Sequence, residues 1–341
     1  MATMKDVARL AGVSIATVSA TVNRSAFVSP ELRSRVTEAI QQLGYAPDGV
    51  ARSLKKGRTQ LLGLIVADIT NAFFTELVHV IEGAVQDAGY SVLLCDTDED
   101  FEKEREFLRI LRSHRVEGVI LAPTGTPDDY LALRGVADRL PLVLVDRALP
   151  DLGFDSVMVD SYAAAYEATA HLVALGHREI ATIAGPAHLG TARDRLEGFR
   201  AALADRGISV RPEFVRSGNF REDDAMAASR DLLTGRVRPS AVFVANNHMM
   251  IGMMRAIATL DLDCPKDISV IGIDDFPWAN AFRPRLTVVR QPVEEIGREA
   301  VRLLLERTRS DTPHPPVRQV LKPSLVVRDS CAPYRAVATS A

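Results

Sequence analysis

The sequence has 341 residues, of which 47% are hydrophobic and 25% charged; this is the composition of an ordinary globular protein, with room for two or three domains. No apolar run reaches the roughly 20 residues that span a bilayer, and the N-terminus lacks an apolar signal-peptide core, so we expect a cytoplasmic protein with no membrane partner. The three cysteines, Cys95, Cys264 and Cys331, are isolated and odd in number, which disfavours a disulfide framework and a cysteine-based zinc site.

The net charge of −3 is unevenly distributed along the chain. Residues 1–60 contain nine basic and four acidic residues, a net of +5, whereas the remainder contains 32 basic and 40 acidic residues, a net of −8. A basic head on an acidic body predicts a nucleic-acid partner for the head and a different role for the body.

The first sixty residues predict three short helices. Thr3 caps the first helix, and Gly12 ends it. Ser14 can cap the second helix, Ser29 begins the third, and Gly44 ends that helix. Three helices with a glycine turn between the first two are typical of a helix-turn-helix unit. The alternative is a small helical bundle that binds no ligand.

The second of these helices, in the stretch "VSIATVSATVN" at 13–23, has the form of a helix that enters a DNA groove. The positions that would face the bases, Ile15, Ala16 and Ala20, carry no hydrogen-bonding group. Either this helix does not bind DNA, or it reads bases without polar contacts.

From Leu61 onward, apolar runs alternate with amphipathic stretches. These runs span residues 61–69, 91–97, 116–123, 141–147, 156–160, 179–185, 240–247 and 268–275. Continuous apolar strands that alternate with helices predict parallel sheets covered on both faces. Eight strands are too many for one small sheet, so we expect an α/β fold with two doubly wound lobes.

Open α/β sheets bind ligands beyond the carboxyl ends of their strands, and here those ends carry acids and amides that suit paired sugar hydroxyls. Aromatic side chains near them suit the C–H face of a sugar ring. For several of these side chains a plainer role stays open. Asp68, Asp96 and Asp275 are also candidates for helix caps, Phe73 and Phe74 for core residues, Arg147 for an ion pair with a neighbouring acid, and Trp278 for packing.

The stretches "MKDVARLAGVSIATVSATVN" and "VSPELRSRVTEAIQQLGYAPDGVARSLKKGRTQLLGLIV" closely resemble the start of LacI-type bacterial transcription regulators. The resemblance continues through "NAFF", "RLEGFRAAL", "AVFVANN", "VIGIDD", "LTVVRQP" and "SLVVRDS", so it covers nearly the whole length. It implies a helix-turn-helix domain with a hinge helix, followed by a two-lobed effector-binding domain similar to periplasmic sugar-binding proteins.

The resemblance implies that the second helix lies in the major groove. Thr17, Ser19 and Asn23 match family positions that contact phosphates, and positions 15, 16 and 20 match the base-reading positions. Relatives typically carry Arg or His at position 20, so Ala20 departs from the pattern and predicts apolar readout that favours A·T pairs. The predicted DNA-binding residues are Thr3, Ser14, Ile15, Ala16, Thr17, Ser19, Ala20, Asn23, Arg24, Ala51, Arg52, Leu54, Lys55 and Lys56.

The later members of this set lie in "PDGVARSLKKG", residues 47–57, which matches the family's hinge helix. Leu54 matches the residue that wedges between the central base pairs, and Ala51 matches a minor-groove contact. Arg52, Lys55 and Lys56 can neutralise phosphates. The alternative is a basic interdomain linker.

In the effector domain the resemblance points to a sugar or sugar derivative as the ligand. Arg195, in "RLEGF", matches the family's effector-binding arginine, and Asp274 matches an acid that holds effector hydroxyls. The predicted effector-binding residues are Phe73, Phe74, Asp146, Arg147, Asp160, Arg195, Phe220, Asn246, Asp274 and Trp278.

The resemblance also implies the domain limits. We expect a DNA-binding domain at 1–46, a hinge helix or linker at 47–58, an effector-binding and dimerisation domain at 59–330 and a tail at 331–341. Lobe 1 should comprise about 59–160 and 291–322, and lobe 2 about 161–290 and 323–330. The tail lacks a leucine heptad, so we expect a homodimer rather than a tetramer.

The predicted function is an allosteric transcription repressor that binds a palindromic operator under the control of a small sugar-like effector. The alternatives are a cytoplasmic solute-binding protein, which the basic head disfavours, and a sugar-converting enzyme. The sequence has no GxGxxG motif after a strand, no phosphate-binding loop and no HExxH motif. We therefore expect no enzymatic activity, no cofactor and no metal site.

Overall fold

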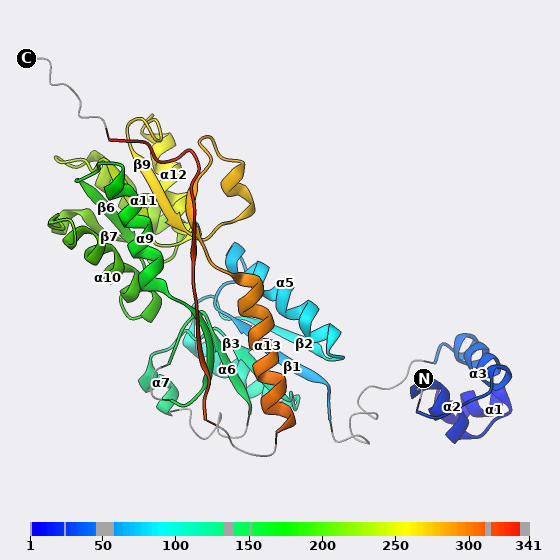
Figure 1. Cartoon of the computed structure of the whole chain (residues 1–341). Coiled ribbons are helices and arrows are strands. Elements are labelled where there is room, and N and C mark those ends of the chain that lie inside the picture. The colour runs from blue at the N-terminus through cyan, green and yellow to red at the C-terminus, as the bar shows by residue number, and fades with distance from the viewer. Residues whose placement is uncertain are drawn as a thin grey trace, which may run out of the picture. The chain divides into compact units, whose positions relative to one another are not determined.

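The computed structural model describes residues 2–23, 25–45, 58–132, 140–149, 152–310 and 315–334 (Figure 1). The chain forms two compact units, unit 1 at Met1–Gln60 and unit 2 at Leu61–Ala341. Ala51, Arg52, Leu54, Lys55 and Lys56 of the predicted hinge lie outside the described residues, as does Arg24.

Unit 1 consists of the three predicted helices, α1 (Met4–Ala11), α2 (Ile15–Asn23) and α3 (Pro30–Leu43). Thr3 caps α1 as predicted and forms a capping box with Asp6, in which each side chain bonds the backbone N–H of the other residue. Gly12 ends α1 with a φ of 61°, a left-handed conformation that glycine adopts without strain.

The core of unit 1 comes from one face of each helix. Val7, Val18 and Val36 are completely buried, one from each helix in turn. Leu10 belongs to the same apolar repeat in the sequence, but it lies half exposed. The helix pattern therefore identifies the buried face of α1 but overstates its width.

Unit 2 contains two six-stranded sheets, each in its own lobe. Lobe 1 has the strand order β11-β5-β4-β3-β1-β2, and lobe 2 has the order β12-β10-β9-β8-β6-β7. The strands of lobe 1 are β1 (Leu61–Val66), β2 (Ser91–Asp96), β3 (Gly118–Leu121), β4 (Leu142–Val145), β5 (Asp155–Val159) and β11 (Arg318–Leu321). Those of lobe 2 are β6 (Ile180–Ala184), β7 (Val215–Ser217), β8 (Ala241–Val244), β9 (Ser269–Ile273), β10 (Thr287–Arg290) and β12 (Ser324–Val326).

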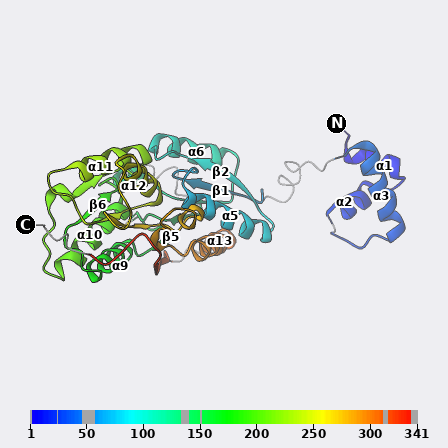
Figure 2. The ribbon, with the colours of Figure 1, turned by 90° about the horizontal axis from the view of Figure 1, so that it is seen from above.

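Helices cover both faces of each sheet. The helices of lobe 1 are α5 (Ala72–Asp87), α6 (Phe101–Ser113), α7 (Pro127–Ala132) and α13 (Val293–Arg309). Those of lobe 2 are α9 (Ser161–Ala174), α10 (Gly190–Ala204), α11 (Glu222–Thr234) and α12 (Asn247–Thr259), with short 3-10 helices at Pro212–Phe214 and Pro277–Asn280. In lobe 1, α5 and α13 lie side by side on one face and α6 covers the other; in lobe 2, α9 and α10 lie opposite α11 and α12 (Figure 2).

The covered faces explain why the strands read as continuous apolar runs. Leu64 and Val66 of β1 belong to the core beneath α5 and α13, whereas Ile65 belongs to the core beneath α6. Both faces of a parallel strand are thus buried, and the expected doubly wound α/β lobes are confirmed. One strand departs from the expected parallel order, because β12 runs antiparallel to β10.

The chain passes between the lobes three times: between β5 and α9, between β10 and α13, and between β11 and β12 (Figure 1). The polar strand ends of both sheets consequently contribute side chains to one region between the lobes.

Candidate nucleic-acid interface and ligand cleft

The second helix of unit 1 presents an apolar open face. The Ser14 hydroxyl accepts the N–H of Thr17 at 3.1 Å and begins α2, as predicted. Val18 points into the core, whereas Ile15 is 46% exposed and Ala16 is also exposed. Ala20 is half-buried on the same helix. The residues predicted to read bases thus leave apolar atoms open to a partner.

Two predicted phosphate-contacting residues bond to one another near the end of α2. The Asn23 amide donates to the Ser19 carbonyl oxygen at 2.9 Å and to its hydroxyl at 3.3 Å. Thr3 is similarly engaged, since its hydroxyl donates to the Asp6 carboxylate at 2.6 Å. Hydrogen bonds from Thr3 lower the pKa of Asp6, which keeps that acceptor ionised.

Arg35 of α3 is a structural residue that sequence reasoning missed. Its guanidinium donates to the carbonyl oxygens of Ala11 at 2.6 Å and Gly12 at 3.3 Å, so it closes the turn between α1 and α2. A Cβ atom at position 12 would lie 2.7 Å from that guanidinium. The close approach of Arg35 therefore favours glycine at this position, in addition to the positive φ. Only the folded unit brings these residues together, since 23 positions separate Gly12 from Arg35.

In unit 2, Arg195 on α10 is buried with part of its guanidinium unused. It donates to the Ala245 carbonyl oxygen at 2.7 Å and lies 5.8 Å from the centre of the Phe220 ring, a cation–π distance. Its Nε is buried without a hydrogen-bond partner in the described structure. Gly185 makes room for this ring, because an added Cβ would lie 2.3 Å from Phe220.

Two buried acids share the electrostatic surroundings of Arg195. Burial raises the pKa of Asp274, opposed by Arg195 and by Gln291, whose amide donates to the Asp274 carboxylate at 2.6 Å. Burial likewise raises the pKa of Asp146, opposed by Arg147 and Arg195. Asp146 and Asp274 act on one another as well, so the ends of β4 and β9 bring two carboxyls and a guanidinium together from both lobes.

Arg147 is engaged by acids, as the ion-pair alternative anticipated. Its guanidinium binds both oxygens of Glu99, at 2.6 and 2.7 Å, and donates to the Pro123 carbonyl oxygen at 3.1 Å. Its Nε lies 3.3 Å from an Asp146 oxygen. Burial by itself would lower the pKa of Arg147, but the Glu99 carboxylate raises it.

The remaining predicted effector residues have structural roles that can be stated from their contacts. Phe73 and Phe74 are buried in the core of lobe 1, with ring centres 5.0 Å apart. Asp160 caps α9 and Asn246 caps α12, each accepting a backbone N–H. Trp278 is 59% exposed beside the Phe276 ring.

The helix-cap alternative is wrong for three acids. The Asp68 carboxylate accepts the backbone N–H and the hydroxyl of Thr70 within a turn, and Asn71 is the residue that caps α5. Asp96 accepts the N–H of Ile69. The third acid, Asp275, is held by arginine side chains, at 2.5 Å from Arg290 and 2.9 Å from Arg328.

Polar contacts between the lobes were not predicted. Arg221 of lobe 2 binds the Asp98 carboxylate at 2.8 Å and its carbonyl oxygen at 3.0 Å. The amide of Asn247 in lobe 2 donates to that of Asn71 in lobe 1 at 2.8 Å, and both side chains are buried. More than 120 positions separate the partners in each pair, so no local pattern could have indicated them.

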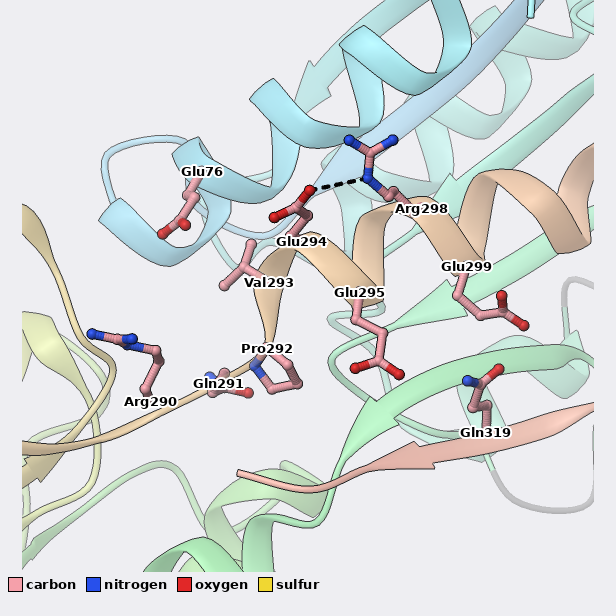
Figure 3. A pocket seen from close by; sticks show the side chains of 10 residues that line it. All are labelled: Glu76, Arg290, Gln291, Pro292, Val293, Glu294, Glu295, Arg298, Glu299 and Gln319. Atoms are coloured by element: carbon pink, nitrogen blue, oxygen red, sulfur yellow. Dashed lines mark hydrogen bonds and ion pairs between the residues drawn. The ribbon is translucent and has the colours of Figure 1, made fainter. Parts of the chain in front are cut away.

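A cavity of about 580 Å³ lies on the passage from lobe 2 to lobe 1, against α13 (Figure 3). It contains none of the predicted effector residues, and its walls include Glu76, Arg290, Gln291 and Glu295. Gln291 also bonds Asp274, so this passage forms one wall of the cavity and supports the buried acid. Burial raises the pKa of Glu76.

Within the described ranges, no group of three or more His, Cys, Asp or Glu side chains has an arrangement that could hold a metal ion. In the same part of the chain, no helix combines the length and apolar character needed to cross a membrane.

The chain is similar to known proteins along nearly all of its length. Residues 3–48 match the model for bacterial regulatory proteins of the lacI family, and residues 169–331 match that for a periplasmic binding protein-like domain. The HTH-type transcriptional repressor PurR of Vibrio vulnificus is 37% identical over 330 residues, covering 97% of this chain and 98% of the repressor. The ribose operon repressor of Escherichia coli is 38% identical over 312 residues, covering 92% of this chain and 94% of the repressor.

Among solved structures, the lac repressor dimer bound to operator and the anti-inducer ONPF matches with a TM-score of 0.86 and 30% identity. The match covers 97% of this chain and 99% of the other. The similarity therefore includes both units, from the helix-turn-helix segment to the two sheets.

Proposed function

Because the chain belongs to the lacI family of bacterial regulatory proteins, we propose that unit 1 recognises a palindromic operator and that the cleft of unit 2 holds the sugar-like effector that controls recognition. Like its relatives, the chain is a DNA-binding transcription repressor and not an enzyme. It works as a homodimer, so two copies of unit 1 can meet the two half-sites of a palindrome.

The proposed effector site is supported by Arg195, Asp146 and Asp274, whose side chains are little exposed and which act on one another electrostatically. Buried ionisable groups with unused hydrogen-bonding capacity are costly unless a ligand or a partner satisfies them. Carboxylates accept hydroxyl protons and a guanidinium donates to hydroxyl oxygens, so this set suits a polyhydroxylated ligand. Phe220, whose ring lies 5.8 Å from the Arg195 guanidinium, would supply an apolar wall, whereas Phe73 and Phe74 belong to the core of lobe 1.

The operator site rests on the open face of α2. Ile15, Ala16 and Ala20 present methyl and methylene groups, which fit thymine methyl groups better than the polar edge of a G·C pair. Thr17, Ser19 and Asn23 would hold phosphates and fix the register. The basic hinge, with Leu54 as the minor-groove wedge, completes this proposal from sequence alone.

The cytoplasm is the proposed place of action, since the partner is chromosomal DNA. A solute-binding protein, the first alternative, would not need the helix-turn-helix segment that residues 3–48 match. We also propose the domain limits and the DNA-binding and effector-binding residues given in the sequence analysis.

The test is a gel shift of the full-length chain with the DNA upstream of its own coding sequence, against scrambled DNA at the same salt concentration. A ligand screen by thermal shift follows, and each stabilising sugar is added to the gel shift. Specific retardation that a stabilising ligand changes supports the proposal. Equal affinity for both DNAs would show that unit 1 is not a sequence reader.

A further inference from the structure

The positive charge of Arg147 is already paired with acids. Glu99 binds both terminal nitrogens, Pro123 accepts a further hydrogen from one of them, and Asp146 lies at ion-pair distance from Nε, which makes no hydrogen bond in the described structure. Arg147 is only 5% exposed, so water does not compete strongly for these bonds. An arginine in a cleft would ordinarily attract carboxylate or phosphate, but this one is already neutralised.

The cleft as a whole has no surplus positive charge. The carboxyls of Glu99, Asp146 and Asp274 face the guanidinium groups of Arg147 and Arg195, three acids against two bases. The free edge of Arg195 also lies within the field of both aspartates. An anion entering here would lose its hydration in a region where carboxyls outnumber guanidinium groups.

Glu99 reaches Arg147 through an unusual backbone. Asp98 and Glu99 both have positive φ, at 52° and 60°, a backbone conformation that residues other than glycine rarely adopt. The Glu99 N–H donates to the Ala67 carbonyl oxygen at 2.7 Å, which anchors this turn to the end of β1. The strained turn directs the Asp98 carboxylate to Arg221 of lobe 2 and the Glu99 carboxylate to Arg147.

From these contacts we propose that Glu99 determines effector specificity: by neutralising Arg147 it reserves the cleft for uncharged, hydroxyl-rich ligands and excludes anionic ones such as sugar phosphates and sugar acids. The inference rests on the proposed function, because it concerns the same cleft. Glu99 acts through Arg147 and is therefore a positioning residue.

The test uses inorganic phosphate as the anionic probe on the full-length chain. Thermal unfolding is followed in increasing phosphate at constant ionic strength, for the wild type, Glu99→Gln and the double variant Glu99→Gln/Arg147→Met. Glu102→Gln is the matched control, since this exposed acid on α6 pairs with Arg105 and makes the same change in charge away from the cleft.

We expect no saturable stabilisation of the wild type or the control by phosphate. Glu99→Gln should gain a saturable response, with half-saturation at a phosphate concentration at least about tenfold below the highest concentration tested on the wild type, and Arg147→Met in the double variant should remove it. D-ribose and D-ribose 5-phosphate serve as a second pair of probes. D-ribose 5-phosphate should stabilise Glu99→Gln more than it stabilises the wild type or the double variant, and D-ribose should not show this difference.

A wild type that phosphate stabilises saturably would overturn the inference, and so would a folded Glu99→Gln without a phosphate response. If Glu99→Gln does not fold, the wild-type titration decides alone: a saturable response overturns the inference, and its absence supports it. The gel shift on the same preparation separates this question from the proposed function. A wild-type chain that binds its operator and is also stabilised saturably by phosphate contradicts this inference but not the proposed function.

Discussion

At the scale of single residues, Ala20 has the most direct consequence for DNA recognition. Its methyl group on the half-buried part of α2 offers no hydrogen bond to a base. Ala20→Arg introduces a donor fork that fits guanine, so the preference at the facing base pair should shift toward G·C by about 1–3 kcal/mol per half-site. The measurement is a pair of titrations at one salt concentration, on operators that differ only at that pair.

The ratio of the two affinities is the informative quantity, because the added charge strengthens binding to every DNA. A variant that tightens equally on both operators would show that residue 20 does not face that base edge.

Arg195 and Asp274 should control the effector response without affecting operator binding. Arg195→Ala and Asp274→Asn each remove a charged hydrogen-bonding group from the cleft, and such bonds contribute about 1.5–3 kcal/mol. The effector concentration for half-maximal response in a gel shift should therefore rise by more than about tenfold for each variant. Unchanged responses in both would place the ligand elsewhere.

Glu104 gives the stability of lobe 1 a pH dependence. Its carboxyl is completely buried and bonds Thr124 and Tyr130, and burial raises its pKa above the ordinary value of 4.5. A raised pKa means that its contribution to stability is full below pH 4.5 and is lost as the pH rises through the folded-state pKa.

Glu104→Gln removes this titration while keeping the shape of the side chain. The wild type should therefore lose stability relative to the variant as the pH rises, by at most about 1.4 kcal/mol per pH unit. Urea unfolding of both chains between mildly acidic and mildly alkaline pH measures the difference. A difference that does not change with pH would mean that Glu104 keeps its ordinary pKa.

At the scale of elements, the turn between α1 and α2 depends on α3 through Arg35. Arg35→Met keeps much of the side-chain volume but leaves the carbonyl oxygens of Ala11 and Gly12 without their donor. Unit 1 should lose about 0.5–1.5 kcal/mol of stability, because Arg35 is exposed and water can partly replace its hydrogen bonds. Arg33→Met is the matched control, because it removes the same charge from another exposed position on α3 whose side chain does not bond the turn.

Amide hydrogen exchange of the full-length chain measures this loss within unit 1 separately from unit 2. Equal protection of α1 and α2 in both variants would show that the turn does not need the guanidinium.

The elements differed in how well sequence could predict them. The helices of unit 1 have caps and end-glycines next to their apolar repeats, and seven of the eight predicted strands are almost entirely buried, so both types were found. The eighth, the edge strand β2, was found from its apolar run although it is partly exposed. The missed strands β7, β11 and β12 lie at sheet edges and are partly exposed, and the buried strand β10 has only two apolar residues in succession, Val288 and Val289. Such strands have no continuous apolar run.

The candidate site was predictable only where each residue follows a strand end or a family motif. Asp146, Arg195 and Asp274 meet that condition. Glu99, which holds Arg147, does not, and Gln291 follows β10 within "LTVVRQP" although nothing in the sequence indicated its bond to Asp274. Their roles depend on contacts between segments that are apart in the sequence. The pattern of residues along one chain does not show which of these segments lie close together in the fold.

At the scale of the whole molecule, the lobes of unit 2 are held together on one side by polar contacts. Arg221 and Asp98 are both partly exposed, so their ion pair contributes at most about 1 kcal/mol. A contact of this strength can break and re-form as the lobes open and close, which a ligand-controlled cleft requires.

Arg221→Ala should therefore weaken the effector response modestly, by up to about fivefold in the concentration for half-maximal effect, because one contact that favours lobe closure is lost. Arg216→Ala is the control, since Arg216 pairs with Asp231 inside lobe 2. The measurement is the ligand-dependent gel shift. An effect equal to that of the control would mean that the Arg221–Asp98 pair plays no part in closure.

Trp278 is the only tryptophan in the sequence, and its indole is 59% exposed on lobe 2. Tryptophan fluorescence of the chain therefore originates from a single place on the surface. An indole in contact with water emits at long wavelength and is open to collisional quenchers such as iodide. When an effector, an operator or a second subunit covers this place, the emission moves to shorter wavelength and quenching falls. The protein thus carries an intrinsic optical probe, and binding at lobe 2 can be followed without any label.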